Sequence, residues 1–453
     1  MGKDTDMKSS PMMSESGKNE LYLYSLKKMA IENADKNRAS LTNLYGLKAF
    51  FCIANELMNN NKDKTYALIR MDIYSFKTVN EFCGREAGDD MLRYISDCFR
   101  KYEKEDTVVG HLRADIFVMC VPFKDRQELI DITSEIKGKI DAYELSCKAF
   151  PAFGICIAKT NMDVSLMCDY ADMALQKIKG KVFTYYAFYD DNMRKELMYE
   201  RRIENEIEDA LRTGCLKVYI QPKVDMRDGG IVGGEALIRW IHPTEGFIYP
   251  DKFIPVLEKS GHIVDVDTFV WHNVIRKIGD RIKNGKRIVP ISLNVSRVHV
   301  YHTNFSEILE NFIREYDISA GYVPLEVTES IFIDDEMNFY DKVTQLQNRG
   351  FKFVMDDFGA GYSSLNMLKT EPVDEVKIDR LFLNDIENRK SQVVIRNIIN
   401  MINELGLDMI AEGVETEEQA ELLKSYGCNK AQGFLYYRPI PMEEFEQLLD
   451  SGM

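Results

Sequence analysis

The chain has 453 residues, of which 45% are hydrophobic, and a formal net charge of −15. This length is too great for one typical hydrophobic core, so we expect two domains, and the apolar share excludes a globally disordered chain. The acidic balance argues against a nucleic-acid-binding protein, because such binding depends on Lys and Arg side chains that neutralise phosphates.

The amino terminus is polar and does not resemble a signal peptide, and no apolar run reaches the roughly 18 residues that span a membrane. We therefore expect residues 1–20 to form a disordered tail. We also expect a cytoplasmic protein with no membrane span.

The pattern of apolar residues in 21–185 predicts an α/β domain with one central sheet. In chain order we expect a helix, a strand, a helix, two strands joined by a tight turn, a helix, a strand and a helix, over residues 46–60, 66–73, 88–102, 107–123, 126–140, 149–158 and 169–180. A charged stretch follows, and we expect residues 186–204 to form a linker helix. Whether this helix carries a signal or only opens the second domain stays open.

Residues 205–453 contain eight short apolar runs rich in β-branched and aromatic residues, most of them separated by stretches with helical periodicity. Eight alternations over roughly 240 residues predict a modified (β/α)₈ TIM barrel. The runs that we expect to form its strands are 216–222, 233–240, 288–296, 323–330, 351–359, 373–380, 407–415 and 431–439.

Several acidic and amide residues each end a short apolar run. They are Glu235, Asn294, Glu326, Asp356, Asp357 and Glu412. In a TIM barrel the functional groups lie at the carboxyl ends of the strands, and hard divalent cations prefer carboxylate and amide oxygens. The pattern therefore predicts a metal site. The adjacent Asp356 and Asp357 cannot both point inward from an ideal strand, so we expect them where the strand ends and a glycine-rich loop begins.

The first domain carries the segments "LTNLYGLKAFF", "MDIYSFKTVNEFCGREAGDDML" and "RADIF", and with these it resembles a GGDEF domain, the diguanylate cyclase fold. The signature is degraded, because Arg113, Ala114 and Ile116 replace two glycines and a glutamate. Ile116 cannot ligate a cation, which leaves Asp72 as the other metal carboxylate that the family implies. We expect no cyclase activity.

Asn80 and Asp89 match positions that contact guanine in active relatives, so the resemblance leaves room for GTP bound as a regulator at the first domain. The alternative, which we favour, is a capped helix and a solvated turn. The inhibitory RxxD motif of the family is also absent, since residues 104–107 read "KEDT".

The second domain resembles an EAL phosphodiesterase along its length, through "QPKVD", "EALIRW", "SLNVS", "LEVTES", "DDFGAGYSSL", "VKIDR", "AEGVET" and "QGFLYYRP". The resemblance implies hydrolysis of cyclic diguanylate (c-di-GMP) to linear 5′-pGpG, with two Mg²⁺ or Mn²⁺ ions, in a homodimer formed through this domain. It implies that the six residues of the metal prediction hold the ions. Catalysis would fall to Glu235, Lys377, Glu412 and Asp357.

The same resemblance implies that substrate is bound by Gln221, Leu237, Arg239, Asp379 and Gln432, and that Glu329 anchors the loop after Asp357. Each of Lys377, Arg239 and Gln432 also has a plainer reading as an ordinary strand or surface residue. Two alternative functions remain: a c-di-GMP receptor that does not cut its ligand, and a phosphodiesterase that GTP activates.

Overall fold

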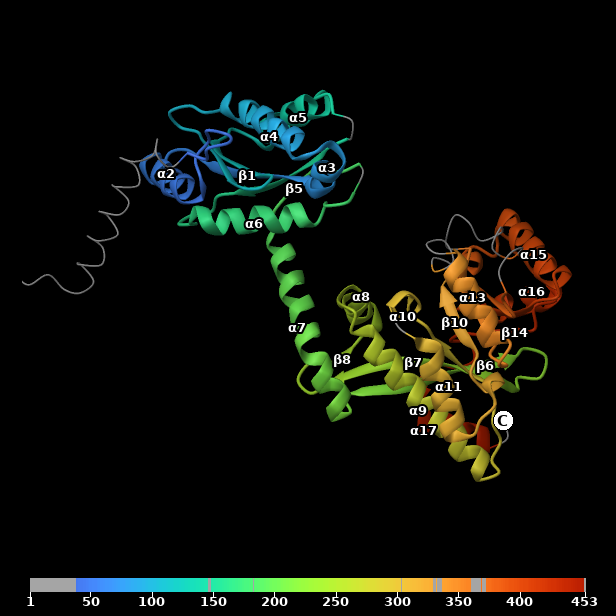
Figure 1. The fold of residues 1–453 in the computed structure, drawn as a ribbon. Helices are drawn as coiled ribbons and strands as arrows, with labels where there is room; N and C mark the ends of the chain where they lie inside the picture. Colours follow the sequence, from blue (N-terminus) through green and yellow to red (C-terminus); the bar gives the residue numbers. More distant parts are fainter. Residues whose placement is uncertain are drawn as a thin grey trace, which may run out of the picture. The chain divides into compact units, whose positions relative to one another are not determined.

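The structure is a computed structural model, and it describes residues 38–145, 148–181, 183–302, 304–328, 331, 336–359, 368 and 372–451. The chain forms two compact units that divide between Met198 and Tyr199 (Figure 1). Residues 1–20, predicted as a disordered tail, lie outside the described residues. Among the residues that are described, no helix is both long and apolar enough to cross a membrane.

The first unit contains a five-stranded sheet in the order β2-β3-β1-β4-β5, which confirms the predicted α/β domain. Strand β1 pairs antiparallel with β3 and β4, whereas β4 and β5 are parallel. The strands are β1 (Tyr66–Tyr74), β2 (Val108–Arg113), β3 (Ile116–Pro122), β4 (Phe150–Ile157) and β5 (Tyr186–Phe188). The helices are α2 (Leu47–Asn60), α3 (Phe76–Cys83), α4 (Arg85–Arg100), α5 (Arg126–Asp141) and α6 (Val164–Gln176).

Alternation along β1 explains why helices cover both faces of this sheet. Ala67, Ile69 and Met71 pack in one buried cluster with residues of α4 and α5, whereas Tyr66 and Leu68 pack in another with residues of α2 and α6. Successive strand side chains point to opposite faces, so each face needs its own helical layer. Figure 1 shows α4 and α5 on one side of the sheet and α6 on the other.

The linker helix predicted at 186–204 has other bounds in the structure, where it is α7 (Asp191–Thr213). Residues 186–188 are strand β5, because their backbone pairs with β4, and the helix begins later and continues beyond residue 204. Its second half opens the second unit, since Ile203, Ile207 and Ala210 are buried in the core of that unit. Gly214 follows with a left-handed φ of 73° and ends the helix.

The second unit is a closed barrel of eight strands, as predicted, in the order β6-β14-β13-β12-β11-β10-β9-β7, and pairing of β7 with β6 closes it. Its strands are β6 (Leu216–Asp225), β7 (Ile231–His242), β9 (Ile291–Asn294), β10 (Leu325–Thr328), β11 (Phe353–Phe358), β12 (Glu375–Ile378), β13 (Asp408–Glu412) and β14 (Lys430–Gln432). Two short strands, β8 (Gly246–Ile248) and β15 (Ile440–Pro441), pair with β7 and β6.

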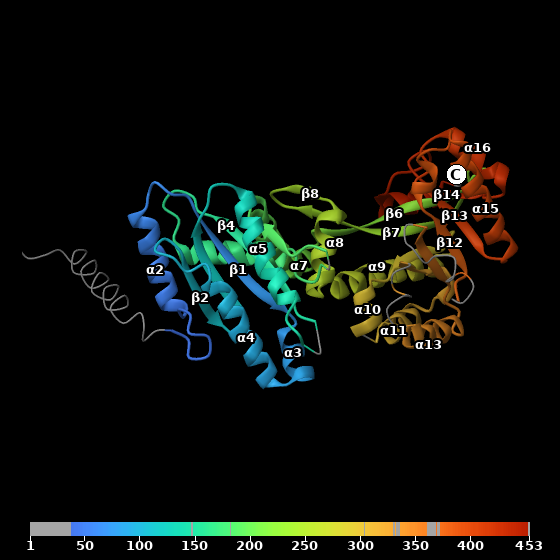
Figure 2. The same ribbon diagram turned by 90° about the horizontal axis from the view of Figure 1, so that it is seen from above.

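The barrel departs from a regular (β/α)₈ arrangement at its first strand. Strand β6 is antiparallel to both neighbours, β7 and β14, whereas the other neighbouring barrel strands run in parallel. The reason is local: only a short turn containing Gly229, with φ of 74°, joins β6 to β7, so the two strands form a hairpin. Figure 2 shows β6 and β7 as two long neighbouring strands.

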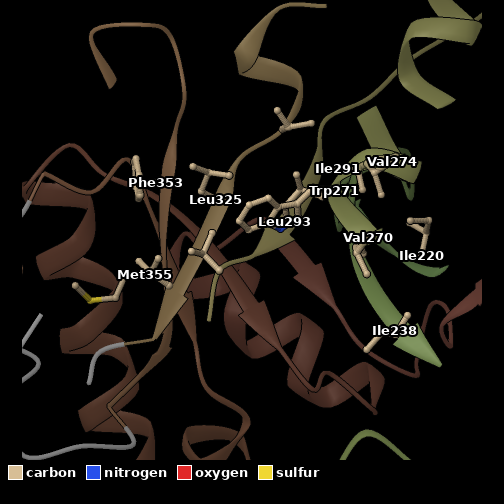
Figure 3. Close-up of a cluster of buried hydrophobic side chains, with 14 of the residues drawn as sticks. Ile220, Ile238, Val270, Trp271, Val274, Ile291, Leu293, Leu325, Phe353 and Met355 are labelled. Atoms are coloured by element: carbon tan, nitrogen blue, oxygen red, sulfur yellow. The ribbon is translucent and has the colours of Figure 1, made fainter. Parts of the chain in front are cut away.

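Helices pack around the barrel and fill its outer core. They are α8 (Pro250–Ser260), α9 (Ile263–Lys283), α10 (Arg297–His302), α11 (Phe305–Tyr316), α13 (Glu336–Gln347), α15 (Arg389–Glu404), α16 (Glu417–Tyr426) and α17 (Met442–Asp450), with short 3₁₀ turns η2 (Ala320–Tyr322) and η3 (Arg380–Leu383). Figure 3 shows Trp271 of α9 beside Leu293 of β9. The Trp271 indole donates a hydrogen bond to the backbone oxygen of Asn294 (3.0 Å). A residue of the outer core thus holds the carboxyl end of β9, where the predicted site residue Asn294 lies.

Candidate active site

Four carboxylates from four strands converge on the ammonium group of Lys377. The side chain of Lys377, on β12, is only 1% exposed. Its Nζ lies 2.6 Å from Glu326 Oε2, 2.6 Å from Glu412 Oε1, 3.0 Å from Asp356 Oδ1 and 3.4 Å from Glu235 Oε2. A buried lysine needs such partners. The structure thus brings five of the predicted site residues into one cluster.

Two side-chain amides orient Glu235 within this cluster. Asn294 Nδ2 donates a hydrogen bond to Glu235 Oε1 (3.1 Å), and Gln432 Nε2 donates to Glu235 Oε2 (2.6 Å). Gln432 Nε2 also donates to Gln221 Oε1 (3.1 Å), and Gln221 Nε2 donates to the backbone oxygen of Tyr437 (3.2 Å). These predicted residues therefore join the cluster through Glu235.

Gln432 has one atom that no described residue satisfies. Its Oε1 is buried and has no hydrogen-bond partner in the described part of the chain. Leaving a buried acceptor unpaired is unfavourable, so this oxygen is available to a ligand, a water molecule or a cation.

A local backbone irregularity turns the adjacent acids Asp356 and Asp357 toward the same place. The register between β11 and β12 shifts between Met355 and Phe358, and Asp357 has a left-handed φ of 54°. Carboxylate oxygens of Asp356, Asp357 and Glu412 lie within 4.8 Å of one another. The alternation of strand side chains is broken here, and the chain can therefore present two consecutive acids.

Because these acids are buried close together, their pKa values move in opposite directions. Burial alone would raise the pKa of Glu326, but Lys223 and Lys377 outweigh it and hold the pKa at about 2. Burial raises the pKa of Glu412 to about 8; Asp356 and Glu235 add to this effect, whereas Lys377 opposes it. Without further positive charge, the cluster therefore favours retaining a proton on one of its acids.

The pKa values of two more acids, Asp357 and Glu235, are also raised by burial and by neighbouring carboxylates. Partial burial raises the pKa of Asp357 to about 6, and the nearby Asp356 and Asp379 contribute. Burial raises the pKa of Glu235, and Glu326 adds to it. Added divalent cations would relieve the repulsion among these acids, and the oxygen-rich donor set suits Mg²⁺ or Mn²⁺. The residues present therefore fit the predicted metal centre.

The remaining predicted substrate residues lie around the cluster rather than in it. Arg239 Nη1 donates a hydrogen bond to the backbone oxygen of Ile238 (2.8 Å), and its guanidinium lies over the Tyr219 ring. Leu237 is half-buried on the same face of β7 as Glu235. Asp379 caps η3 by accepting a hydrogen bond from the Leu381 amide (2.7 Å). Glu329, the predicted loop anchor, lies outside the described residues.

Lys223 is a buried residue of this site that the sequence reasoning did not single out. It is 6% exposed, and its Nζ contacts Ser292 Oγ (2.7 Å) and Glu326 Oε1 (2.8 Å). Burial would lower the pKa of Lys223, but Glu326 and Glu375 outweigh this effect and raise it. The available signal was a lysine in the segment "QPKVD", just after the predicted strand 216–222 and two residues after Gln221. The observed strand β6 continues to Asp225, and alternation then places both side chains on one face.

In the first unit, Asp72 at the end of β1 is buried and forms an ion pair with Lys179 Nζ (2.9 Å). Asp115 lies beside it and accepts a hydrogen bond from the Ile73 amide (3.1 Å), and burial together with Asp72 raises the pKa of Asp115 to about 7. Ala114 keeps a left-handed φ of 46° in the β2–β3 turn, and Ile116 is buried.

The two predicted guanine contacts of this unit, Asn80 and Asp89, both lie in helices. Asn80 is part of α3, and its side chain packs against Gly88 of α4. Asp89 is an exposed residue inside α4. The solvated turn that we favoured for Asp89 is therefore wrong, because the chain turns earlier, at Gly84 with φ of 89°.

Comparison with known proteins identifies two family matches. The EAL domain family model matches residues 204–439, and the model of the diguanylate cyclase GGDEF domain matches residues 37–183. The chain is 30% identical over 389 residues to the bifunctional diguanylate cyclase/cyclic di-GMP phosphodiesterase MucR of Pseudomonas aeruginosa, covering 84% of this chain and 57% of MucR. It is 28% identical to the cyclic di-GMP phosphodiesterase PdeR of Escherichia coli, covering 96% of this chain and 68% of PdeR.

The chain thus spans little more than half the length of MucR. Among solved structures, it is similar to the PaMucR phosphodiesterase in complex with c-di-GMP, at 36% identity and a TM-score of 0.52, over 54% of this chain and 99% of that one. The match to the EAL model covers more than half of the chain. The protein therefore belongs to the EAL domain family and carries a GGDEF domain in tandem before its EAL domain.

Proposed function

We propose that this protein is a c-di-GMP-specific phosphodiesterase that hydrolyses c-di-GMP to linear 5′-pGpG at the acid cluster around Lys377. The observation that carries the proposal is the convergence of Glu235, Glu326, Asp356 and Glu412 on one buried lysine, with Asp357 beside them. The phosphodiesterase activities for which MucR and PdeR are named, and the c-di-GMP complex of the PaMucR phosphodiesterase, support the choice of substrate.

Two Mg²⁺ or Mn²⁺ ions would be held by the predicted ligands, Glu235, Asn294, Glu326, Asp356, Asp357 and Glu412. Such ions lower the pKa of a bound water and offset charge on the attacking and leaving oxygens of a phosphodiester. In the reaction, the attacking water gives up a proton as its oxygen bonds to phosphorus, the bond from phosphorus to O3′ breaks, and O3′ takes up a proton. The sum is one water added across the P–O3′ bond.

The residues of this chain have separate tasks in that reaction. Lys377 orients the attacking water and offsets the negative charge that develops on phosphorus, because its ammonium is fixed and shielded from solvent. Gln432 keeps Glu235 in place and offers its unpaired Oε1 to the bound groups. Arg239 reaches a substrate phosphate with its guanidinium. Gln221, Leu237 and Asp379 complete the substrate contacts.

The first domain acts as a regulator without cyclase activity. Ile116 stands where the family signature has a carboxylate, and Lys179 already pairs with Asp72. GTP at this domain, near Asn80 and Asp89, is the regulatory ligand that the resemblance allows. We further propose a cytoplasmic homodimer formed through the EAL domain, with Glu329 anchoring the loop after Asp357.

The direct test is to incubate the purified chain with c-di-GMP and Mg²⁺ or Mn²⁺ and to separate the products by chromatography. The proposal predicts pGpG that is absent when a chelator is added. Retained binding of c-di-GMP with no pGpG from the wild-type protein would instead favour the non-catalytic receptor. A hydrolysis rate that depends on added GTP would favour the GTP-activated phosphodiesterase.

A further inference from the structure

Lys223 lies deeper in the barrel than the acids that surround Lys377. On the β6–β7 hairpin, Gln221 is opposite Glu235 and Lys223 is opposite Gly233, two residues nearer the amino end of β7. Side chains two residues apart share a face, so Lys223 projects into the barrel as Gln221 does. Its partner Ser292 likewise precedes Asn294 by two residues on β9.

Glu326 is held between two lysines at different depths. Its Oε1 lies 2.8 Å from Lys223 Nζ, and its Oε2 lies 2.6 Å from Lys377 Nζ. Glu326 is 1% exposed, so no bulk water can replace either partner. Rotation of this carboxylate would separate a buried ion pair, which is strongly unfavourable. Lys377 also pairs with three other acids of the cluster. Lys223, deeper in the barrel, pairs with Glu326 alone among these acids.

We propose that Lys223 is a positioning residue for the metal centre: it binds Glu326 Oε1 and thereby keeps Oε2 turned toward Lys377, Asp356 and Glu412. This inference rests on the proposed function, because it assumes that Glu326 is one of the ligands of a divalent ion. Lys223 does not itself contact substrate, because Glu326 lies between it and the upper cluster.

Substitution of Lys223 by methionine separates positioning from packing, because methionine fills a similar volume without the ammonium. The measurement is the affinity of the purified full chain for Mn²⁺ without c-di-GMP, by titration calorimetry. We expect K223M to bind Mn²⁺ about 10- to 100-fold more weakly, the usual effect of removing a residue that orients a metal ligand. Lys223→Arg, which retains the charge, should recover most of the affinity. Lys217→Met, at an exposed lysine on the same strand, should leave it unchanged.

Thermal unfolding of each variant shows whether it is folded, and Lys223→Gln replaces K223M if methionine prevents folding. Mn²⁺ affinity of the folded neutral variant within about 2-fold of wild type would overturn the role of Lys223, since orienting residues have larger effects. Equal losses of Mn²⁺ affinity in the neutral variant and in K223R would also overturn this role of Lys223. Failure of the proposed function is distinct: wild-type protein would then bind Mn²⁺ with the expected dependence on Lys223 and yet form no pGpG.

Discussion

Lys377 and Glu326 form a 2.6 Å ion pair inside the barrel, and each residue is only 1% exposed. Breaking such a buried pair by removing one partner is strongly unfavourable, because an uncompensated charge remains. The pair therefore fixes the geometry of the acid cluster, and it places a cation where negative charge would develop during hydrolysis of a phosphodiester.

Substitution of Lys377 by methionine should abolish most hydrolysis of c-di-GMP. Among the described residues, Lys223 is the only other lysine paired with any of the four acids, and it pairs with Glu326 alone among them. We therefore expect kcat to fall roughly 100- to 1,000-fold, as for loss of one preorganised donor. Steady-state kinetics at saturating Mn²⁺ measures this effect. Lys352→Met, at an exposed lysine before β11, is the matched control and should retain the wild-type rate. A K377M variant with near wild-type kcat would contradict the assigned role.

Substitution of Asp357 by asparagine should raise the concentration of Mn²⁺ needed for activity. Asp357 and Asp356 present oxygens to the same place. Removing a residue that only orients a metal ligand lowers metal affinity roughly 10-fold or more, so removing a ligand itself should lower it at least as much. The test is the rate of hydrolysis as a function of Mn²⁺ concentration. Asp341→Asn, at an exposed acid on α13, should not shift the curve. An unchanged curve for D357N would remove Asp357 from the ligand set.

Asp267 on α9 should make the stability of the protein depend on pH. It is 8% exposed and accepts a hydrogen bond from the Ser296 amide (3.2 Å), and burial raises its pKa to about 7. The folded state therefore binds the proton more tightly than the unfolded state. Its contribution to stability is fully present below the unfolded pKa of about 4 and is lost as the pH rises to about 7.

Asp267→Asn keeps an acceptor for Ser296 and carries no charge, so it should remove this pH dependence. Relative to wild type, its free energy of unfolding should rise by up to about 4 kcal/mol between pH 4 and pH 8, because each pKa unit corresponds to about 1.4 kcal/mol. Urea unfolding at several pH values measures the difference. For the control Asp251→Asn, at an exposed acid of α8, the free energy of unfolding should depend on pH as it does in wild type. A D267N curve parallel to wild type as well would show that Asp267 is not protonated in the folded state.

The first domain should not convert GTP to c-di-GMP. Ile116, which stands where the resemblance to the GGDEF family implies a metal carboxylate, is buried, and Asp72 forms an ion pair with Lys179. The measurement is product formation from GTP with Mg²⁺ in the Lys377→Met variant, in which any c-di-GMP would escape hydrolysis. Accumulation of c-di-GMP there would contradict a silent first domain.

Much of the fold followed from local patterns in the sequence. The eight apolar runs predicted the barrel strands, and their polar residues predicted the cluster, because strand ends bring such groups together whatever the helices do. The antiparallel direction of β6 was missed, since it depends on a short turn rather than on the apolar pattern. The strand at 186–188 was missed because three residues beside a helix carry too little periodicity.

Side-chain partnerships were harder to predict than positions. Lys377 and Lys223 both stand in strands, but only the three-dimensional register shows that they bind opposite oxygens of Glu326. Arg239 shares a face with Glu235, as alternation predicts, yet its guanidinium lies over Tyr219 and its hydrogen bond goes to the backbone of Ile238. Rotamers and cross-strand register decide such contacts, and neither is written in the spacing of residue types.

The most direct test of the account is hydrolysis of c-di-GMP by the wild-type chain with Mn²⁺ in isotopically labelled water, followed by mass spectrometry. We expect linear pGpG that carries one labelled oxygen on its 5′-phosphate, and no product when a chelator removes the metal. Wild-type protein that binds c-di-GMP but forms no pGpG, or forms it equally well in chelator, would contradict the account.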